Sequence, residues 1–287
     1  MTASDKAQGW TTVITPKTNL LDIDLREIWQ YRDLLTIFIW RSLQVRYKQT
    51  VLGPLWFFIG PIITVFMYTL VFGNIANIST DGLPQPLFYL SGTALWGYFS
   101  VCFGSAAGAL VGNAGIYSKV YYPRLINPLA AMVSNLVDFG VEMLLFFALY
   151  IYYYFFTSAP IHLTWAALLF PVLVLMLAGM GLGIGLFFSS ISTKYRDLNI
   201  LIGFFFKLWM YATPIIYPLS TVTNAKLHML MCLNPLTGII EMFKYGFLGT
   251  GYHNPWLLLY SFGFMSVFLV LGTLVFNKAQ RNFMDTV

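Results

Sequence analysis

The sequence predicts an all-α integral membrane protein with six transmembrane helices, an N-terminal amphipathic interfacial helix and a re-entrant helix pair between the fifth and sixth spans. The first observation is compositional: only 9% of the 287 residues are charged and 58% are hydrophobic, with a mean hydropathy of +0.72. Soluble domains carry roughly 25% charged residues, so most of this surface must face lipid. The second observation is a series of apolar stretches of membrane length, and the third is the clustering of basic residues in alternate loops.

The N-terminal region predicts a helix that lies on the membrane before the first span. Residues 1–33 form a mainly polar cytosolic segment, and residues 34–50 mix aliphatic and aromatic side chains with Arg41, Arg46 and Lys48. Such a segment tends to lie in the interface plane. The apolar run before Arg41 is far shorter than the roughly 20 residues that a spanning helix needs. We therefore expect an amphipathic interfacial helix over 34–50.

Six apolar stretches follow as the expected spans. They cover approximately residues 51–73, 87–112, 125–156, 163–188, 200–217 and 255–276. The fourth stretch has glycine at every second position from Gly179 to Gly185. These glycines lie inside an apolar segment and follow no soluble strand, so we interpret them as a helix-packing surface and not as a nucleotide-binding motif. The transmembrane domain therefore extends over 51–276, and residues 277–287 form a cytosolic tail.

Residues 219–254, between the fifth and sixth spans, have a different pattern. The segment is moderately apolar, but Asn234-Pro235 interrupts it, and neither half reaches about 20 residues. Two short helices that enter the membrane from the outer side and return would fit this pattern, because such backbone is tolerated where protein or water covers it.

The distribution of basic residues predicts the orientation. Thirteen of the sixteen Lys and Arg residues lie in the N-terminal region, the tail and the two loops 113–124 and 189–199. The opposite side has only Lys226 and Lys244. Because Lys and Arg mark the cytoplasmic side, we expect a multi-pass plasma membrane protein with both termini in the cytoplasm.

Three charged residues lie within the predicted spans. Asp138 and Glu142 share one helical face of the third span, four residues apart, and Lys207 lies in the fifth. Each such charge costs about 2.5–3.5 kcal/mol on insertion scales. We therefore expect Lys207 to pair with Asp138 or Glu142, or all three to face an aqueous cavity. A structural ion pair, a proton or ion relay and a polar patch on a transport path all remain open.

Aromatic residues are abundant, with 26 Phe, 18 Tyr and 8 Trp. Interfacial belts at the span ends account for many of them. Others lie deeper, where they either line a water-filled path and stack on sugar rings or face lipid: Trp56, Phe57, Trp96, Phe99, Phe204, Phe205, Phe206 and Trp209.

Enzyme signatures are missing from the sequence. It contains no Gly-x-x-x-x-Gly-Lys-Ser/Thr phosphate loop, so we do not expect this chain to hydrolyse ATP. Cys102 and Cys232 are far apart and have no metal or redox spacing. We therefore expect no catalytic residue, metal or cofactor in this chain, and no nucleic-acid partner. Loops 113–124 and 189–199 are too short for a catalytic domain but long enough to dock into a partner.

Five segments together resemble a known family. They are Arg46-Tyr47-Lys48-Gln49-Thr50 with Leu52-Gly53-Pro54-Leu55-Trp56, Lys119-Val120-Tyr121-Tyr122-Pro123-Arg124, Tyr195-Arg196-Asp197-Leu198, Thr213-Pro214-Ile215-Ile216-Tyr217 and Asn234-Pro235-Leu236. In sequence and position they are similar to segments in the permeases of polysaccharide ABC exporters. These are type-2 ABC exporters that serve O-antigen (Wzm-like), capsule and teichoic-acid chains.

The resemblance implies a homodimer of this permease with two copies of a separate nucleotide-binding ATPase subunit, which uses ATP and Mg²⁺. It implies that a lipid-linked, O-antigen-like polysaccharide moves from the cytoplasm across the plasma (bacterial inner) membrane through a channel at the dimer interface. By the resemblance, the residues that transmit movement from the ATPase would be Lys119, Tyr121, Tyr122, Arg124, Lys194, Tyr195, Arg196 and Asp197. The residues that face the sugar chain would be Trp56, Phe57, Phe204, Phe205 and Trp209.

By the same resemblance, Arg41, Arg46 and Lys48 would sit where a diphosphate lipid head group enters; anchoring to anionic lipid is the alternative role. Two other functions remain open. One is a type-2 ABC permease for teichoic acid, capsule, a small lipid or a drug. The other is an intramembrane enzyme that uses the three charged residues of the spans.

Overall fold

The computed structural model describes residues 25–47, 53–117, 122–157, 159–193 and 197–286. Within these ranges the protein is helical and contains no strand, so the predicted all-α fold is confirmed. Four helical segments in the described ranges are long and apolar enough to cross a membrane: Trp56–Ile75, Ile126–Phe156, Trp165–Ser192 and Pro255–Gln280. The chain is therefore a multi-pass membrane protein, and the count of six spans stays a prediction.

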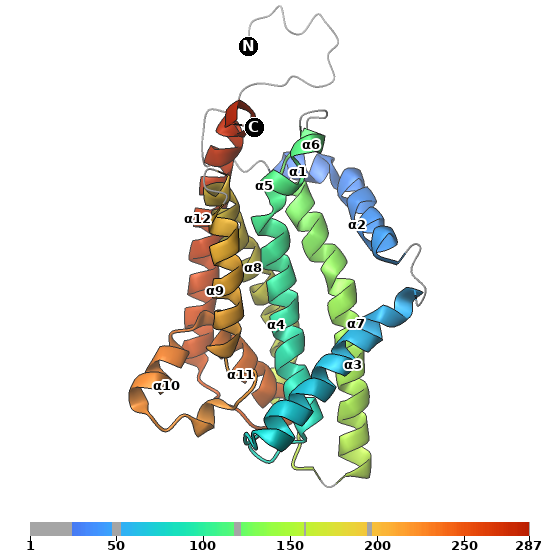
Figure 1. The fold of residues 1–287 in the computed structure, drawn as a ribbon, viewed down its shortest axis with the longest axis vertical. Helices are drawn as coiled ribbons and strands as arrows, with labels where there is room; N and C mark the ends of the chain where they lie inside the picture. Colours follow the sequence, from blue (N-terminus) through green and yellow to red (C-terminus); the bar gives the residue numbers. More distant parts are fainter. Residues whose placement is uncertain (1–24, 48–52, 118–121, 158, 194–196, 287) are drawn as a thin grey trace, which may run out of the picture.

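The helices run along the chain in a simple order. They are α1 (Leu25–Gln30), α2 (Arg32–Tyr47), η2 (Gly53–Leu55), α3 (Trp56–Tyr68), η3 (Thr69–Ile75), α4 (Gln85–Ala107), α5 (Ala109–Gly112), α6 (Ala114–Tyr117), α7 (Ile126–Phe156), η4 (Trp165–Leu169), α8 (Phe170–Ser192), α9 (Leu198–Tyr211), η5 (Leu219–Thr221), α10 (Ala225–Cys232), α11 (Pro235–Leu248) and α12 (Pro255–Thr286). Figure 1 shows α4, α7, α8, α9 and α12 along the long axis. We call the end that holds α1 and α6 the α1 end, and the opposite end, which holds α10 and α11, the α11 end.

Helix α8 is the centre of the bundle and packs against both α4 and α12. Its glycines make these contacts close. A Cβ on Gly183 would lie 2.6 Å from the backbone nitrogen of Leu269 on α12, and a Cβ on Gly185 would lie 2.5 Å from Ala106 Cβ on α4. Small residues of this kind let helix backbones approach one another in a membrane. The geometry therefore supports the interpretation of these glycines as a packing surface.

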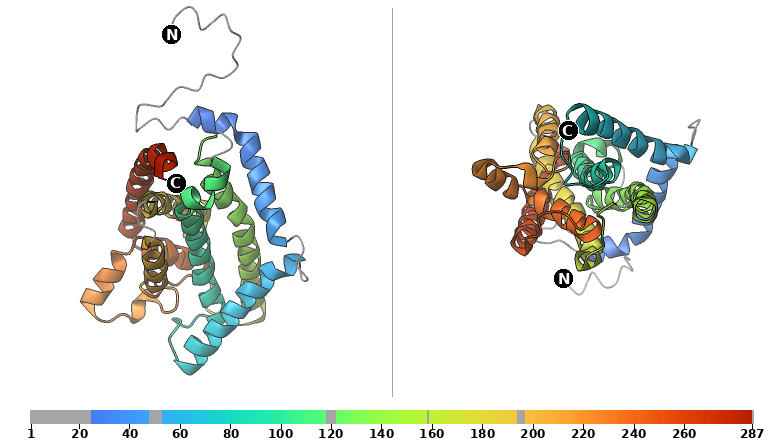
Figure 2. Two further views of the ribbon diagram at one scale, coloured as in Figure 1. Left: turned by 45° about the horizontal axis from the view of Figure 1, so that its top comes forward. Right: turned by 90° about the horizontal axis from the view of Figure 1, so that it is seen from below.

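Helices α2 and α3 lie at the edge of this bundle. Helix α2 packs beside α7, and α3 crosses α4 and α7 obliquely (Figures 1 and 2). The interfacial helix was predicted over 34–50, and of these residues 48–50 lie outside the described ranges. Because α2 rests against a long apolar helix, one of its sides is covered by protein.

Two helix boundaries differ from the predicted ones. The fifth predicted span, 200–217, ends as α9 at Tyr211. Pro214 lacks a backbone N–H and disfavours helical conformation in the residue before it, which stops the helix early. Helix α12 continues to Thr286, through residues predicted to form a tail, because no Gly or Pro follows Phe276 to end it.

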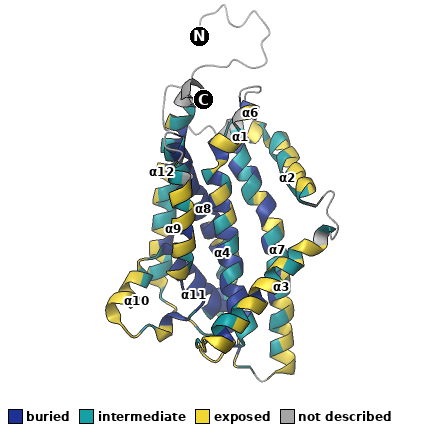
Figure 3. Ribbon diagram, viewed as in Figure 1, coloured by how far each residue is buried: buried dark blue, intermediate teal, exposed yellow. Residues whose placement is uncertain are grey.

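The two short helices predicted for 219–254 are present as α10 and α11, and they differ sharply in burial. Helix α10 has no buried residue, whereas 13 of the 14 residues of α11 are buried (Figure 3). The break falls at Asn234-Pro235, where the Asn234 side chain caps α11 by accepting from Leu236 N at 3.1 Å. Their re-entrant depth in a membrane stays a prediction.

Candidate functional site

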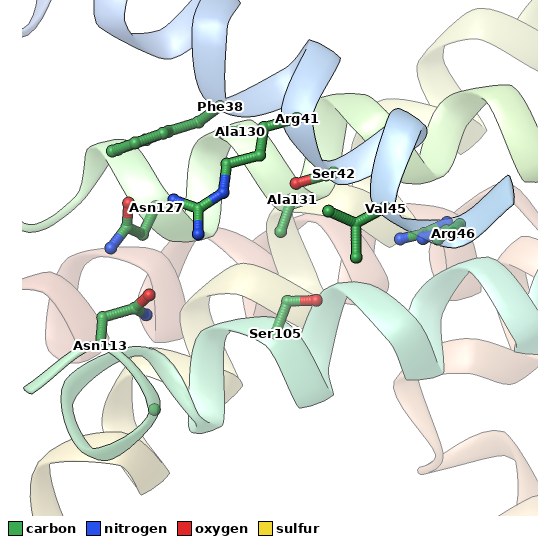
Figure 4. Close-up of a pocket in the computed structure, with 11 residues that line it drawn as sticks. Phe38, Arg41, Ser42, Val45, Arg46, Ser105, Asn113, Asn127, Ala130 and Ala131 are labelled. Carbon is green, nitrogen blue, oxygen red and sulfur yellow. The ribbon is translucent and has the colours of Figure 1, made fainter. Parts of the chain in front are cut away.

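A polar cavity lies near the α1 end, between α2, the α4–α5 segment and α7. Its volume is about 520 Å³. Eleven residues line it: Phe38, Arg41, Ser42, Val45, Arg46, Ser105, Gly112, Asn113, Asn127, Ala130 and Ala131. Figure 4 shows α2 on one side of the cavity, with α7 and the segment around Ser105 and Asn113 on the others. Two of the predicted head-group residues, Arg41 and Arg46, are therefore brought to one cavity, and Lys48 lies outside the described residues.

Arg41 supplies the charge of this cavity that has no partner among the described residues. Its side chain extends from α2 into the cavity beside Asn127 (Figure 4). Among the described residues it forms no hydrogen bond or ion pair. A guanidinium presents five N–H donors in a planar fork that matches phosphate and carboxylate oxygens. A guanidinium without a partner in the described part of the chain makes this side of α2 suitable for binding an anion.

Arg46 is already engaged at the other side of the cavity. Its guanidinium donates to the Asp138 carboxylate and to the Asn135 side-chain oxygen on α7. About one third of each side chain of the ion pair is exposed, at 33% for Arg46 and 32% for Asp138. The pair fastens α2 to α7 and neutralises one of the two cavity arginines.

This contact corrects the prediction for the charges within the spans. Asp138 pairs with Arg46 and not with Lys207, and no ion pair of Lys207 is found in the described part of the chain. Lys207 is exposed on α9, and the Glu142 carboxylate lies beside Gly97 of α4. The predicted pairing of Lys207 was wrong because it placed Arg46 in a separate interfacial segment, out of reach of the third predicted span. The alternative, that all three charges face an aqueous cavity, stays a prediction.

The loop before α7 is held by a hydrogen-bonded cluster next to the cavity. The Asn127 amide donates to the hydroxyls of Tyr117 and Tyr122, each at 3.0 Å, and the Tyr117 hydroxyl in turn donates to the Arg124 carbonyl at 3.2 Å. Burial raises the pKa of Tyr117, which keeps this phenol a neutral donor. Arg124 donates to the Gln280 carbonyl of α12.

The two described coupling residues of this loop, Tyr122 and Arg124, therefore face inward. Tyr122 is buried, and its ring meets Phe38 of α2 edge-on at 5.7 Å between centroids. Arg124 joins the loop to α12 and also lies over the Tyr117 ring, 5.3 Å from its centroid. Lys119 and Tyr121 lie outside the described residues.

In the second predicted coupling loop, Lys194, Tyr195 and Arg196 lie outside the described residues. Asp197 is exposed at the start of α9, where its side chain makes no capping hydrogen bond. The structure therefore shows only the boundary of this loop, and its contact with a partner stays a prediction.

The candidate path aromatics divide into two groups. Trp56, Phe204 and Phe205 are exposed, and Phe57 is half-buried. Trp209 turns toward the protein interior: its ring meets Trp96 edge-on at 6.2 Å, and its indole N–H donates to Asn234 at 3.0 Å. Three of the five residues thus lie exposed on the surface of this chain, whereas Trp209 holds α9 to its neighbours.

Sequence reasoning missed a buried ion pair on α11. Lys244 Nζ lies 3.6 Å from Glu241 Oε1, and both side chains are only 2% exposed. The lysine also donates to the Pro214 carbonyl at 2.6 Å. The signal was present in the sequence, because an acid and a base three residues apart in an apolar helix face the same side.

Comparison with known proteins identifies the family of the chain. Residues 33–248 match the model of the family described as ABC-2 type transporter. The chain is 32% identical to an "O-antigen export system permease protein RfbA" of Myxococcus xanthus over 77% of this chain and 82% of the relative. It is 27% identical to a protein of the same name from Klebsiella pneumoniae, over 88% and 94%. It is 22% identical to the "Polysialic acid transport protein KpsM" of Escherichia coli, over 70% and 76%.

The match covers most of the chain, including α2, the cavity and α11. It confirms the resemblance to type-2 ABC exporter permeases that the sequence motifs indicated. A permease of this family is not itself an enzyme. The chain belongs to the ABC-2 type transporter family, as its membrane-spanning permease component.

Proposed function

We propose that the chain is the permease of an ATP-driven exporter that moves a lipid-linked, O-antigen-like polysaccharide from the cytoplasm across the bacterial inner membrane. The observation that carries the proposal is the cavity at α2, which offers the Arg41 guanidinium beside a bundle of membrane-spanning helices. An acidic lipid head group at the membrane surface needs such a site. The names of the relatives support a polysaccharide as the cargo.

The cavity suits a phosphate or diphosphate group. Its volume of about 520 Å³ lies within the usual range of small-molecule sites, about 300–1,000 Å³. Charge-assisted hydrogen bonds from Arg41 would bind the phosphate oxygens, and the hydroxyls of Ser42 and Ser105 line the same space. Asp138 compensates Arg46, so Arg41 would supply most of the binding charge. Lys48 is proposed to act together with Arg41 and Arg46 at this site.

The sugar chain is proposed to pass along exposed aromatic faces. Phe204 and Phe205 lie on α9 with 62% and 55% of their surfaces exposed, among other exposed apolar residues of the same helix. Trp56 and Phe57 lie at the start of α3. Apolar surface on this scale calls for a partner or lipid. We propose that two copies of the chain face each other here and that sugar rings stack on these aromatics in the channel between them.

ATP would be hydrolysed by a separate subunit, present in two copies with Mg²⁺, that contacts loops 113–124 and 189–199 on the cytoplasmic side. Both termini are proposed to lie on that side. Movement of the first loop would reach α12 through Arg124 and the cavity through Asn127, since these side chains form the cluster described above. The loop and the head-group cavity would then respond together.

Two alternatives differ in cargo or in class. A type-2 permease for teichoic acid, capsule, a small lipid or a drug would use the same fold with a different ligand. An intramembrane enzyme is disfavoured, because Asp138 is engaged by Arg46 and the described structure forms no cluster of Asp138, Glu142 and Lys207.

The head-group proposal is tested by binding of a short-chain isoprenyl diphosphate to the purified permease. Arg41→Gln should weaken binding about ten-fold, the effect of losing a charged hydrogen bond worth about 1.5 kcal/mol. Arg32→Gln is the matched control, because Arg32 lies on the same helix but does not line the cavity.

Two further ligands separate the sources of phosphate. Inorganic diphosphate tests the charge alone, and phosphatidylglycerol vesicles test anchoring to anionic lipid. Equal isoprenyl diphosphate affinity for the Arg41→Gln variant and the unmodified protein would contradict the proposal. A loss confined to the vesicles would assign Arg41 to membrane anchoring instead.

A further inference from the structure

The backbone after α9 leaves carbonyl groups that its own helix cannot satisfy. Helix α9 ends at Tyr211, so the carbonyls of Ala212 and Pro214, which follow it, lie outside its hydrogen-bond ladder. Pro214 brings no N–H to this segment. Two side chains from another part of the chain supply the missing donors. The Asn234 amide donates to the Ala212 carbonyl at 3.1 Å, and Lys244 Nζ donates to the Pro214 carbonyl at 2.6 Å.

Asn234 connects two helices at once. Its side-chain oxygen caps the N-terminus of α11 through Leu236 N and also accepts from the Trp209 indole at 3.0 Å. Its amide further donates to the Thr213 hydroxyl at 2.8 Å. The end of α9 and the beginning of α11 therefore share one polar residue.

Lys244 adds a charged contact on the next turns of α11. Its ammonium lies 3.9 Å from the centre of the Phe88 ring of α4 and 3.6 Å from Glu241 Oε1. The other Glu241 oxygen accepts from Tyr252 N at 2.9 Å. Burying an ion pair is costly, and apolar replacement is often neutral or stabilising. A charge retained inside a buried helix is more useful for fixing an arrangement than for stability.

The two helices that meet here differ in how firmly they are held. Helix α11 packs against α12, η4, α4 and α8, and it does so at backbone distance. A Cβ on Gly238 would lie 2.8 Å from the Leu257 carbonyl of α12, and a Cβ on Gly246 would lie 2.9 Å from Ala167 N of η4. On α9 the exposed side chains extend from Ile200 to Tyr211, and Phe206 alone among its described side chains is buried. A helix that packs loosely within its own chain is thus fastened at one end to a firmly packed one.

We propose that Asn234 and Lys244 form a clamp that fixes the C-terminal end of α9 to α11, so that α9 pivots there and moves at its N-terminal end. The N-terminal end follows directly from loop 189–199. In the proposed transport cycle, which this last step assumes, a push on that loop would swing α9 against the clamp and change the channel without displacing α11. Both residues are positioning residues in this scheme and need not touch the cargo.

The clamp is tested first on the isolated permease, without ATPase or cargo. A spin label at Tyr211→Cys reports the motion of the clamped end, and one at Leu201→Cys reports the free end. Cys232→Ser removes the accessible native thiol, and Cys102 is buried. The clamp is broken by Lys244→Met with Glu241→Gln, which leaves no unpaired buried charge, and separately by Asn234→Ala. Lys226→Met, an exposed lysine on α10, is the matched control.

If the clamp exists, both clamp variants should increase the mobility of the spin label at position 211. The Lys226→Met control should leave that mobility unchanged. An immobile label at 211 in both folded variants would overturn the proposal.

A second measurement addresses positioning in the reconstituted complex with its ATPase. Cargo exported per ATP hydrolysed should fall about five-fold, the lower end of typical coupling between sites. An unchanged ratio with lower thermal stability would make the contact merely structural. Failure to export any polysaccharide would sink the proposed function but leave the label result standing.

Discussion

Arg46 of α2 donates to the Asp138 carboxylate of α7, so these two helices are tied together. The link closes one side of the Arg41 cavity and sets the distance between α2 and α7. Removing its acid with Asp138→Asn should lower the free energy of unfolding by about 1–2 kcal/mol, less than a fully buried pair would lose, because a third of each side chain meets solvent.

A double-mutant cycle with Arg46→Gln checks this value by thermal unfolding in detergent. The surface pair Arg32–Asp33, at 3.8 Å, serves as the control and should show no measurable coupling. Additive effects of Asp138→Asn and Arg46→Gln would mean that the contact does not hold α2.

Lys207 should be dispensable for folding. Its side chain is exposed and forms no ion pair among the described residues, so Lys207→Met should change the unfolding free energy by less than about 0.5 kcal/mol. Thermal unfolding beside Lys244→Met, which removes a lysine that is 2% exposed, gives the contrast. A large loss of unfolding free energy in Lys207→Met would instead support the predicted intramembrane ion pair. Normal folding with lost export would place Lys207 on the transport path.

Glycine-to-alanine substitutions on α8 and on α7 should change the stability of the protein in different directions. Gly183→Ala places a methyl group 2.6 Å from the Leu269 backbone and should destabilise by about 1–3 kcal/mol through overpacking. Gly140→Ala on α7 meets nothing within 4 Å and should be neutral or stabilising by up to about 1 kcal/mol. Unfolding temperatures in one detergent compare the two. Equal effects would refute the close packing of α8 on α12.

Asn127 should control the loop before α7. Asn127→Ala removes the donor to two tyrosine hydroxyls and should lower the free energy of unfolding by about 1–2 kcal/mol. The variant should also bind the ATPase more weakly, because the loop loses its fixed position. Co-purification with the ATPase and thermal unfolding measure the two effects. Ser266→Ala on α12 is the control, since that hydroxyl donates to Phe262 within its own helix at 2.9 Å and lies outside the cavity and both coupling loops.

The fold was largely predictable from the sequence because membrane helices are encoded by length and hydropathy. The third predicted span, 125–156, matches α7 to within one residue, and the glycines of the fourth predict its packing. Two helix boundaries were predicted less accurately. Helix α9 ends six residues before 217 because Pro214 stops it, and α12 continues because nothing in its sequence ends it.

The candidate site was only partly predictable. The clustering of Arg41 and Arg46 followed from the sequence, but the partner of Arg46 did not, because Asp138 lies 92 residues away. Asn127 and Ser105 could not be assigned to a site at all, since an isolated polar residue carries no signal for the cavity it lines. Lys244 was counted only as an outer charge, although its spacing from Glu241 was visible in the sequence.

The most direct measurement is transport by purified permease and its ATPase in sealed vesicles loaded with lipid-linked polysaccharide on the ATPase side. The account predicts that the glycan becomes accessible on the opposite side only when ATP, Mg²⁺ and both subunits are present, and that Arg41→Gln slows this step while Arg32→Gln does not. Glycan that crosses without the ATPase, or ATP hydrolysis by this chain alone, would contradict it.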